Sequence, residues 1–306
     1  MLSVVVPTYE RPRSLARALE SILRQTHLPD EVVVVDNATS AATAAVVRAA
    51  ANSADLPVRY VREQAPGASS ARNRGVAESA GDVIAFLDDD SVAAARWLEA
   101  LLDAYTTTSG VAAVGGRIEL RWPCARPAWV DGLDGYYGTF DLGEERREID
   151  QPLYPYASNL LFERAAFVGV GGFPPELGRR GQSALANEED GLFRRVAARG
   201  LRVLYEPNAL VYHRVEGARL TRTWLLRRTF VQGRSDVLVD ALFDGSRTRA
   251  QRAARAAAAL ADGAAALRIA AARRRSSPMG PLTRATIHLG SAYEDLRLAL
   301  GGAPSP

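Results

Sequence analysis

The chain of 306 residues contains no lysine, one cysteine and three histidines, so all of its 38 basic residues are arginine. A single cysteine, Cys124, excludes an internal disulfide framework and fits a reducing compartment. No stretch approaches the roughly 18 uninterrupted apolar residues of a membrane-spanning helix. The amino terminus enters an apolar strand at Leu2, without the basic and apolar regions of a signal peptide. We therefore expect a cytoplasmic protein.

A glycine-rich phosphate loop is also missing. The first two predicted strands run into Pro7-Thr8 and Asp36-Asn37, and neither is followed by G-x-G-x-x-G. A dinucleotide cofactor is therefore poorly supported. The apolar content of 47% is that of an ordinary globular protein, and the length accommodates one large α/β domain with an appendage or two modest domains.

Charge is distributed unevenly along the chain. Residues 1–213 carry 22 arginines and 28 acidic residues, whereas residues 214–306 carry 16 arginines and 7 acidic residues. The basic part alternates arginine with alanine rather than with aromatic residues, so we do not expect it to bind nucleic acid. Basic amphipathic helices can lie peripherally on the inner face of a membrane. The alternative, which we favour, is a packed helical appendage or a contact between subunits; the sequence does not predict the oligomeric state.

Apolar strands and amphipathic helices alternate through the first 118 residues. Near-continuous Val, Ile and Leu runs separated by helices predict an α/β fold whose mostly parallel sheet is covered on both faces. The predicted strands are 2–6, 31–35, 58–61, 83–87 and 111–118, and the predicted helices are 12–25, 41–51, 68–79 and 92–106.

From residue 119 to 156 the alternation stops, and proline, glycine and aromatic residues become frequent. A long irregular insertion in a compact domain is often a lid or a binding loop, although its aromatic residues can equally pack the insertion against the sheet. Regular structure is then predicted as strands over 157–162, 201–205 and 209–213, and as helices over 163–168 and 188–199. Residues 218–300 predict two or three helices, with a linker over 273–281.

Three consecutive aspartates, Asp88, Asp89 and Asp90, directly follow the apolar strand 83–87. Open α/β sheets bind ligands at the carboxyl ends of their strands. Carboxylates crowded in this way repel one another unless they are neutralised, and a divalent cation carrying a phosphate would do so. The alternative is a helix cap, in which Asp90 or Ser91 begins a helix near Val92.

Other polar residues are predicted near the same edge. Asp36 ends the second strand, where a carboxylate can hydrogen-bond a base or ribose. Gly67 leads into a helix start, whose free N–H groups favour anions, and Arg72 and Asn73 can add donors to the same nucleotide. The alternative for this helix is an amphipathic helix with solvated arginines.

In their order along the chain, these pieces resemble the inverting family 2 glycosyltransferases of the GT-A fold. The matching segments are V-V-V-P-T-Y-E-R, V-V-V-V-D-N, P-G-A-S-S-A-R-N-R-G, G-D-V-I-A-F-L-D-D-D, A-S-N-L-L-F-E-R with V-G-G-F, N-E-E-D-G-L-F-R-R and A-L-V-Y-H-R. The resemblance implies a three-layer α/β/α domain over 1–217, with a nucleotide-sugar half (1–118) and an acceptor half (119–217). A basic helical appendage over 218–306 would follow.

The resemblance implies a metal-assisted transfer of sugar from a nucleoside diphosphate to an acceptor hydroxyl, as in polysaccharide or glycoconjugate biosynthesis. The D-x-D motif of the family falls on Asp88 and Asp90, which would bind Mg²⁺ or Mn²⁺ at the diphosphate. His213 occupies a position from which the family's histidine approaches the metal or diphosphate, although a lone histidine is often a structural residue. The expected donor-binding residues are Pro7, Thr8, Glu10, Asp36, Arg72, Asp88 and Asp89.

Two positions depart from the family pattern or leave it open. The family commonly carries another acid five residues after the strand-end acid; here this residue is Ala41, and we expect Ser40 to cap the helix instead. The general base falls in the acidic group Glu188-Glu189-Asp190. Alignment on Leu192, Phe193 and Arg195 places the acidic pair of the family on Glu188-Glu189, whereas matching the letters E-D places it on Glu189-Asp190. Glu189 belongs to both pairs, so we choose it as the base, with Asp190 as its rival. Acids in a first helical turn also serve as simple caps.

Neither the sugar nor the acceptor can be predicted, and the donor nucleotide can be UDP, GDP or dTDP. A sugar-phosphate nucleotidyltransferase would share the α/β sheet and the metal chemistry. That class normally uses a glycine-rich loop and a catalytic lysine, and the absence of lysine argues against it. A second alternative is a nucleotide-sugar-binding or scaffold protein without catalytic activity.

Overall fold

The computed structural model describes residues 1–178, 185–243, 245, 247–272 and 279–302. Contacts divide the chain into two compact units that interleave along the sequence. The first, here called the sheet unit, comprises Met1–Arg121, Gly138–Pro175 and Leu192–Arg214. The second, here called the helical unit, comprises Trp122–Tyr137, Glu176–Gly191 and Val215–Pro306. The division into domains at residues 118 and 217 remains a prediction.

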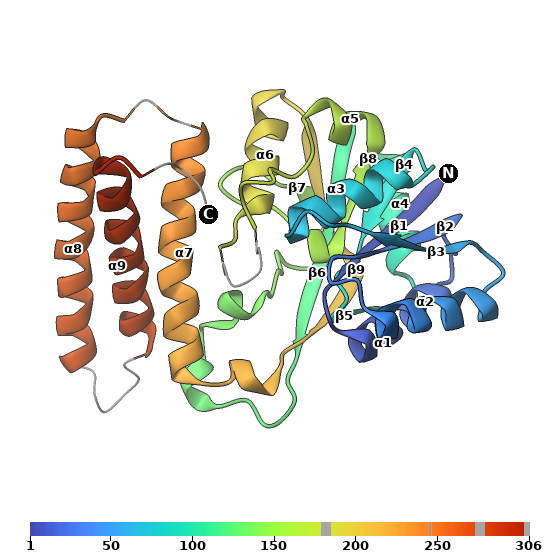
Figure 1. Ribbon diagram of the computed structural model, residues 1–306, viewed down its shortest axis with the longest axis horizontal. Coiled ribbons are helices and arrows are strands. Elements are labelled where there is room, and N and C mark those ends of the chain that lie inside the picture. Colours follow the sequence, from blue (N-terminus) through green and yellow to red (C-terminus); the bar gives the residue numbers. More distant parts are fainter. Residues whose placement is uncertain (179–184, 244, 246, 273–278, 303–306) are drawn as a thin grey trace. The chain divides into compact units, whose positions relative to one another are not determined.

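Within the described residues, the sheet unit contains one nine-stranded sheet in the order β3-β2-β1-β4-β8-β6-β9-β5, with β7 paired to β9 (Figure 1). Successive pairings show that β1–β4, β6 and β9 run in one direction and that β5, β7 and β8 run against them. The mostly parallel sheet is therefore confirmed. The strands are β1 (Leu2–Thr8), β2 (Glu31–Asp36), β3 (Val58–Arg62), β4 (Val83–Phe86), β5 (Ser91–Ala93), β6 (Val111–Arg121), β7 (Arg147–Glu148), β8 (Leu160–Glu163) and β9 (Arg202–Arg214).

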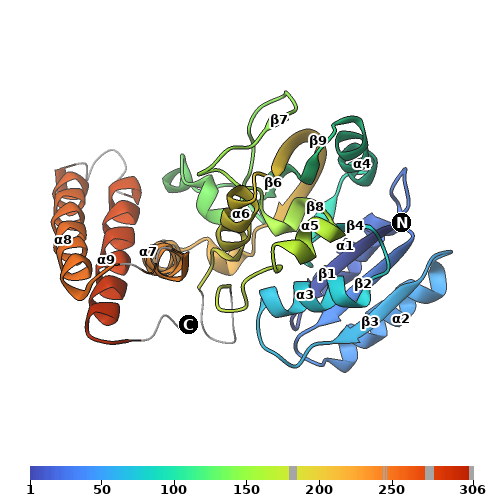
Figure 2. The same cartoon turned by 90° about the horizontal axis from the view of Figure 1, so that it is seen from above.

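Helices cover both faces of this sheet, as Figure 1 and Figure 2 show from two directions. Alternate residues of each buried strand point to opposite faces, so Val4 and Val6 pack with α1 and Val5 packs with α3. One face carries α1 (Pro12–Leu23), α2 (Ala41–Ser53) and α4 (Trp97–Thr107). The other carries α3 (Ala68–Glu78), α5 (Arg164–Gly169) and the second half of α6 (Glu188–Ala198). The predicted three-layer α/β/α arrangement is confirmed.

One predicted element is wrong at its start, because no helix begins at Val92. Residues Ser91–Ala93 instead form β5, which pairs antiparallel with β9, and α4 begins only at Trp97. Gln25 satisfies the start of this helix from another part of the chain. Its side-chain nitrogen donates to the Ala94 carbonyl over 2.8 Å, and its oxygen accepts from the Leu98 amide over 3.0 Å.

Two proline positions also differ from the prediction. Pro7 lies inside β1, beyond the last residue that pairs with β4, so its missing N–H costs no hydrogen bond on that side. The strands predicted over 201–205 and 209–213 are one strand, β9. Its pairing with β6 shifts register between Gly116 and Ile118, and this irregularity accommodates Pro207 without ending the strand.

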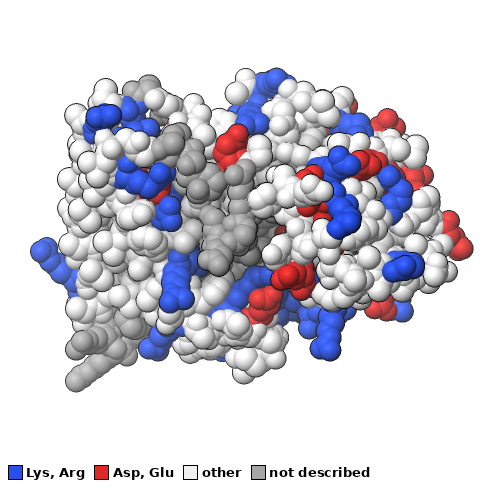
Figure 3. Space-filling model, viewed as in Figure 1, with Lys and Arg blue, Asp and Glu red and all other residues white. Residues whose placement is uncertain are grey.

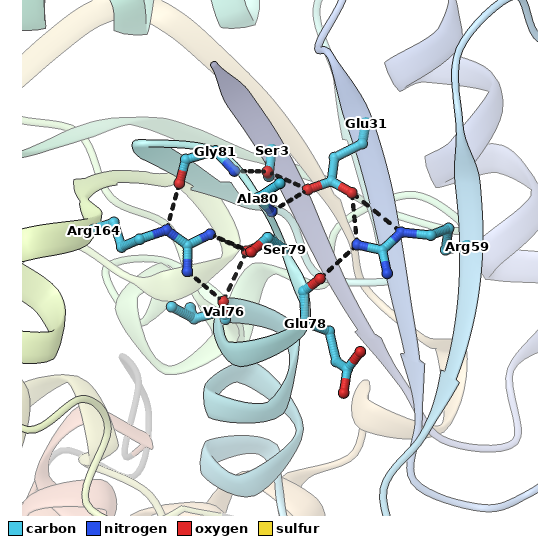
Figure 4. A network of polar contacts seen from close by, with 9 residues as sticks. All are labelled: Ser3, Glu31, Arg59, Val76, Glu78, Ser79, Ala80, Gly81 and Arg164. Carbon is cyan, nitrogen blue, oxygen red and sulfur yellow. Dashed lines mark hydrogen bonds and ion pairs between the residues drawn. The ribbon is translucent and has the colours of Figure 1, made fainter.

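The end of α3 is fastened to the amino edge of the sheet by two arginines (Figure 4). Arg164 donates to the carbonyls of Val76 and Ser79 over 2.7 and 2.6 Å. Arg59 bridges the carboxylate of Glu31 and the last turn of the helix. Because the final carbonyls of a helix lack partners within it, these bonds satisfy them and fix where α3 lies on the sheet.

The helical unit contains α7 (Arg222–Phe243), α8 (Arg249–Ala272) and α9 (Met279–Ala299), which run side by side in Figure 1. Residues 273–278 of the predicted linker lie outside the described residues, and 279–281 already belong to α9. The surface formed by α8 and α9 in Figure 3 carries mainly arginine among its charged side chains. Inside the unit, Arg234 pairs with the fully buried Glu294 over 2.9 Å. In the part of the chain that is described, no helix is long and apolar enough to cross a membrane.

Two segments from the middle of the chain pack within this helical unit. Leu177 and Leu185 join Leu238 and Val239 of α7 in one apolar cluster. The ring of Tyr137 stacks on Trp224, with centroids 5.1 Å apart, and meets Trp122 edge-on. The remaining residues of 122–137 include 3₁₀ turns at Ala128–Val130 and Asp134–Tyr137.

Candidate active site

Parallel pairing brings the ends of three strands to one edge of the sheet. Thr8 at the end of β1 pairs with Asp36 at the end of β2, and β4 lies on the other side of β1. The three aspartates follow β4 after one residue, Leu87, and they turn tightly, because the Ser91 amide donates to the Asp88 carbonyl over 3.1 Å. Thr8 and the acidic residues therefore lie at the same edge of the sheet, where the sequence predicts them.

Asp89 points into the protein. Its carboxylate accepts a hydrogen bond from the Thr8 hydroxyl over 2.7 Å, and only 5% of the residue is exposed. Arg11 approaches the other oxygen at 3.4 Å. Burial, followed by the negative charge of Asp90, raises the pKa of Asp89 to about 6, although Thr8 and Arg11 act in the opposite direction. Asp89 is thus tied to the end of β1.

Asp90 lies between a guanidinium and an imidazole. Arg11 Nη1 is 2.9 Å from Asp90 Oδ2, and His213 Nδ1 is 3.3 Å from Asp90 Oδ1. The backbone enforces this neighbourhood, because Ser91 pairs with His213 in the β5–β9 ladder and the Arg214 amide donates to the Asp90 carbonyl over 3.0 Å. His213 is therefore brought beside one acid of the predicted D-x-D motif.

Asp88 pairs with Arg72, which lies on α3, the helix that precedes β4. Arg72 Nη2 lies 2.8 Å from Asp88 Oδ1, and only 4% of Arg72 is exposed. Its guanidinium carbon lies 5.4 Å from the ring centroid of Phe173, a cation–π distance. Asn73 fixes Phe173 in turn, since its amide donates to the Phe173 carbonyl and its oxygen accepts from the Phe173 amide.

Asp36 is fully buried and holds the turn after β2. Its oxygens accept from the amides of Ala38 and Ser40 over 2.9 and 2.7 Å, and from the Tyr60 hydroxyl over 2.8 Å. Burial, followed by this bond to Asp36, raises the pKa of Tyr60 to about 12. The Ser40 side chain accepts from the Thr43 amide and caps α2, as predicted from the substitution at Ala41.

The two remaining residues predicted to bind the donor, Pro7 and Glu10, differ in their exposure to solvent. Pro7 is buried within β1. Glu10 is exposed and has a φ of 54°, in the left-handed region that few residues other than glycine adopt. Backbone strain of this kind often accompanies functional sites.

Arg11 is the site residue that was missed from the sequence. It bridges Asp89 and Asp90, which are almost eighty positions away along the chain. The available signal was its place directly after the strand-end motif P-T-Y-E, at the edge where the acids converge. A structural role of Asn37 was also not predicted: its side chain donates to the carbonyls of Glu63 and Ala65 and thereby anchors the loop that precedes α3.

The predicted base candidates belong to the helical unit. Glu188, Glu189 and Asp190 form the first turn of α6, and Glu188 is buried. Among the described residues, no group of three or more His, Cys, Asp or Glu side chains is arranged to hold a metal ion. The three predicted metal ligands are placed as above, with Asp90 beside His213 and Asp88 beside Arg72.

Known proteins resemble this chain in sequence and in fold. A glucosyl-dolichyl phosphate glucuronosyltransferase of Haloferax volcanii is 32% identical over 252 residues, which cover 79% of this chain and 78% of the relative. The succinoglycan biosynthesis protein ExoM of Rhizobium meliloti is 30% identical over 242 residues, which cover 76% of this chain and 73% of that protein.

The fold is shared with a solved structure, the mannosyltransferase PcManGT from Pyrobaculum calidifontis in complex with GDP-Man and Mn²⁺. The two superpose with a TM-score of 0.62 at 22% identity, covering 96% of this chain and 86% of the other, which establishes a common GT-A architecture. The model of the family described as Glycosyl transferase family 2 matches residues 3–167, the stretch that contains the acidic edge. The chain is therefore a glycosyltransferase and belongs to family 2.

Proposed function

We propose that the protein transfers a sugar from a nucleoside diphosphate sugar to an acceptor hydroxyl, with inversion at the anomeric carbon and with the assistance of a divalent cation. The observation that carries this proposal is the acidic edge of the sheet. There Asp88 and Asp90 lie beside Arg72, Arg11 and His213, so charges of both signs are concentrated where an open α/β sheet binds its ligand.

A nucleoside diphosphate fits the chemistry of this edge. Arg72 and the amino end of α3 are suited to an anion, because both present N–H groups. The fold neighbour was solved with GDP-Man, and the relative from Haloferax is named a glucuronosyltransferase. We therefore infer a UDP-, GDP- or dTDP-linked sugar as donor for this chain.

The side chains at this edge are of the types that bind a hard divalent cation. Asp88 and Asp90 offer carboxylate oxygens, which Mg²⁺ and Mn²⁺ prefer, and His213 adds an imidazole nitrogen that lies 3.3 Å from Asp90. When bound, the ion supplies positive charge beside the diphosphate as the nucleotide departs. We assign Asp88, Asp90 and His213 as its ligands, while Asp89 stays hydrogen-bonded to Thr8.

We assign Glu189 as the general base, with Asp190 as the alternative and Glu188 beside them. The base takes the proton from the acceptor hydroxyl as its oxygen forms a bond to the anomeric carbon. The bond from that carbon to the diphosphate oxygen breaks on the opposite side, and the nucleoside diphosphate leaves with the electron pair. One such displacement inverts the configuration of the sugar.

The first test identifies the donor and the metal. Thermal shift with UDP, GDP and dTDP in the presence of Mn²⁺ should reveal one stabilising nucleotide, and the matching UDP-glucose, GDP-mannose or dTDP-glucose then serves as donor for hydrolysis and transfer. EDTA should abolish activity and added Mn²⁺ or Mg²⁺ should restore it. NMR of the product gives the anomeric configuration, and a retained configuration would overturn the inverting mechanism.

Variants then test the assigned residues. Asp90→Ala should lower kcat/KM by about 100-fold or more, since it removes a ligand of the ion. Asp82→Asn is the matched control, because Asp82 lies at the opposite end of the same strand and its side chain is 85% exposed. Glu189→Gln should lower kcat by about 10²–10⁴-fold with little change in nucleotide affinity. Full activity of Asp90→Ala in EDTA would exclude the metal role, and nucleotide binding without any turnover would favour a binding protein.

A further inference from the structure

The helix that carries the assigned base begins at an unusual residue. Asn187 directly precedes α6 and has a φ of 76°, in the left-handed region, while 94% of the residue is shielded from solvent, leaving 6% exposed. Asparagine tolerates this conformation better than most residues, but holding it still requires surrounding contacts. The Asn187 carbonyl accepts from the Gly191 amide, so the conformation of Asn187 is continuous with the first turn of α6.

The contacts that hold Asn187 come from α7. Its amide nitrogen donates to Asp236 Oδ1 over 2.7 Å, and its amide oxygen accepts from Gln232 Nε2 over 2.7 Å. Gln232 also donates to Asp236 Oδ1 over 2.8 Å. The three side chains thus form a closed triangle, here called the Asn187 clamp, in which both ends of the asparagine amide are engaged.

Neighbouring contacts secure the same junction. The Ala186 amide donates to the Ser235 hydroxyl over 3.0 Å, and Ser235 is fully buried. Leu185 packs with Leu238 and Val239 on the same helix. The three residues before the acidic turn therefore all contact α7: Leu185 by apolar packing, Ala186 through its backbone amide and Asn187 through the clamp. All of these contacts lie within the helical unit.

Charge links the clamp to the acidic turn. Burial raises the pKa of Asp236, the hydrogen bonds from Asn187 and Gln232 oppose this rise, and the negative charge of Asp190 adds to it. The charge of Asp190, in the turn whose carboxylates are assigned to proton transfer, therefore acts on a member of the clamp. A small rotation of α6 about its first turn would move those carboxylates relative to the acceptor.

We propose that Asn187 is a positioning residue for Glu189, and that Gln232 and Asp236 of α7 hold it so that the acidic turn of α6 has one orientation. This inference rests on the proposed role of Glu189 as the base. On this proposal α7 contributes to catalysis by holding Asn187, and it is not a separate appendage.

The kinetic test compares Asn187→Gly with Gln232→Ala. Glycine adopts a φ of 76° without strain, so Asn187→Gly removes the clamp and leaves the backbone conformation accessible. Both variants should lower kcat by about 10- to 100-fold, as expected for a displaced catalytic group, with the KM for the donor changed less than threefold. Their double variant should be no slower than the worse single variant, because both changes break the same clamp. Arg227→Ala, an exposed position on α7, is the control and should keep wild-type kinetics.

Hydrogen exchange provides a readout that does not depend on catalysis. The peptide covering 185–193 should exchange faster in Asn187→Gly and Gln232→Ala than in the wild type and Arg227→Ala, while peptides of β1 and β4 stay unchanged. The inference is overturned if both clamp variants exchange at the wild-type rate. It is also overturned if Glu189→Gln inactivates the enzyme while both clamp variants keep the wild-type kcat. If Glu189→Gln stays fully active while exchange increases, the assignment of the base fails and the clamp is a structural contact alone.

Discussion

The three adjacent aspartates that follow β4 have different sets of partners. Asp88 pairs with Arg72, Asp89 accepts from Thr8, and Asp90 lies between Arg11 and His213. Each partner comes from a different element, so the side chains of one short acidic run serve separate purposes. The arginines partly offset the repulsion among the carboxylates.

We expect that a positive charge alone cannot replace Arg72 at the site. Its guanidinium pairs with Asp88 and lies over Phe173 at once, and lysine has no planar group that can do both. We expect Arg72→Lys to lower kcat/KM by about tenfold and to destabilise the protein by about 1–2 kcal/mol. Arg74→Lys is the control, since Arg74 is 46% exposed and makes a surface pair on the same helix. Equal kinetics and equal urea unfolding of the two variants would contradict this.

Tyr60 should make the fold sensitive to alkaline pH. Its pKa is raised from 10.0 to about 12 by burial and by the bond to Asp36, so the folded state holds the phenolic proton more tightly than the unfolded chain. This contribution to stability is complete below pH 10 and is lost as the pH rises through about 12. Tyr60→Phe should cost about 1–2 kcal/mol at pH 8 and show a weaker loss of stability between pH 10 and 12.

Unfolding by urea at several alkaline pH values measures the effect of this substitution. Ultraviolet titration should show that Tyr60→Phe has one phenol fewer than the wild type in the group that ionises near pH 12, to which Tyr137 also belongs. A stability profile of Tyr60→Phe parallel to that of the wild type would show that Tyr60 does not contribute to the pH dependence.

The sequence predicted the acids at the site better than their partners. Asp36 and Asp88–Asp90 follow apolar strands, and a parallel sheet necessarily collects such positions at one edge. Arg11 was not predicted, because its role depends on the direction of a long side chain across a turn. The buried bonds of Asp36 depend on the conformation of the turn after β2, which residue types alone do not specify.

At the scale of elements, the turn that directly follows α5 supports Arg72 through Asn73 and Phe173. Gly172 has a φ of 66°, and a Cβ atom there would lie 2.7 Å from Asn73 Oδ1. Gly200 has a similar φ of 64°, with nothing within 4 Å of such an atom. Comparing the two glycines therefore separates the cost of the backbone conformation from the cost of crowding Asn73 and Phe167.

We expect Gly200→Ala to destabilise the protein by about 1 kcal/mol and Gly172→Ala by about 2–4 kcal/mol. Only Gly172→Ala should also lower kcat/KM, because Asn73 and Phe173 support Arg72. Urea unfolding and donor hydrolysis of both variants check this. Equal losses of stability would show that Asn73 and Phe167 move aside at no cost.

The elements that were mispredicted share one cause. A helix from Val92 has good local propensity, yet Ser91–Ala93 pairs with β9, which is more than a hundred residues away. A break at Pro207 is also reasonable locally, yet the pairing with β6 carries the strand across it. In both cases tertiary hydrogen bonds override the local preference of the chain. The first four strands have no such competition and were predicted within two residues.

At the scale of the whole molecule, the two compact units interleave along the chain. Segments 122–137 and 176–191 belong to the helical unit although they precede β9. The predicted boundary at residue 217 would cut this unit, because Leu177 and Leu185 pack with α7. A chain that ends at residue 217 would expose both leucines and lack the partners of Asn187.

We expect such a truncated chain to aggregate and to have no measurable donor hydrolysis. Size-exclusion chromatography and the hydrolysis assay test this, with the full chain as reference. Supplying residues 218–306 as a separate polypeptide should recover part of the activity. A monodisperse and fully active truncated chain would show that the first 217 residues are sufficient.

The same interleaving has a consequence for biosynthesis. Proteins fold as they emerge from the ribosome, amino-terminal part first, and the early strands β1–β4 can pair once they have been made. Tyr137, Leu177 and Leu185 emerge long before Trp224, Leu238 and Val239, which cover them in the finished molecule. During the intervening synthesis these apolar side chains are without their native partners. The nascent chain therefore passes through an interval in which chaperone binding to these two segments should be strongest, and that interval ends when α7 leaves the exit tunnel.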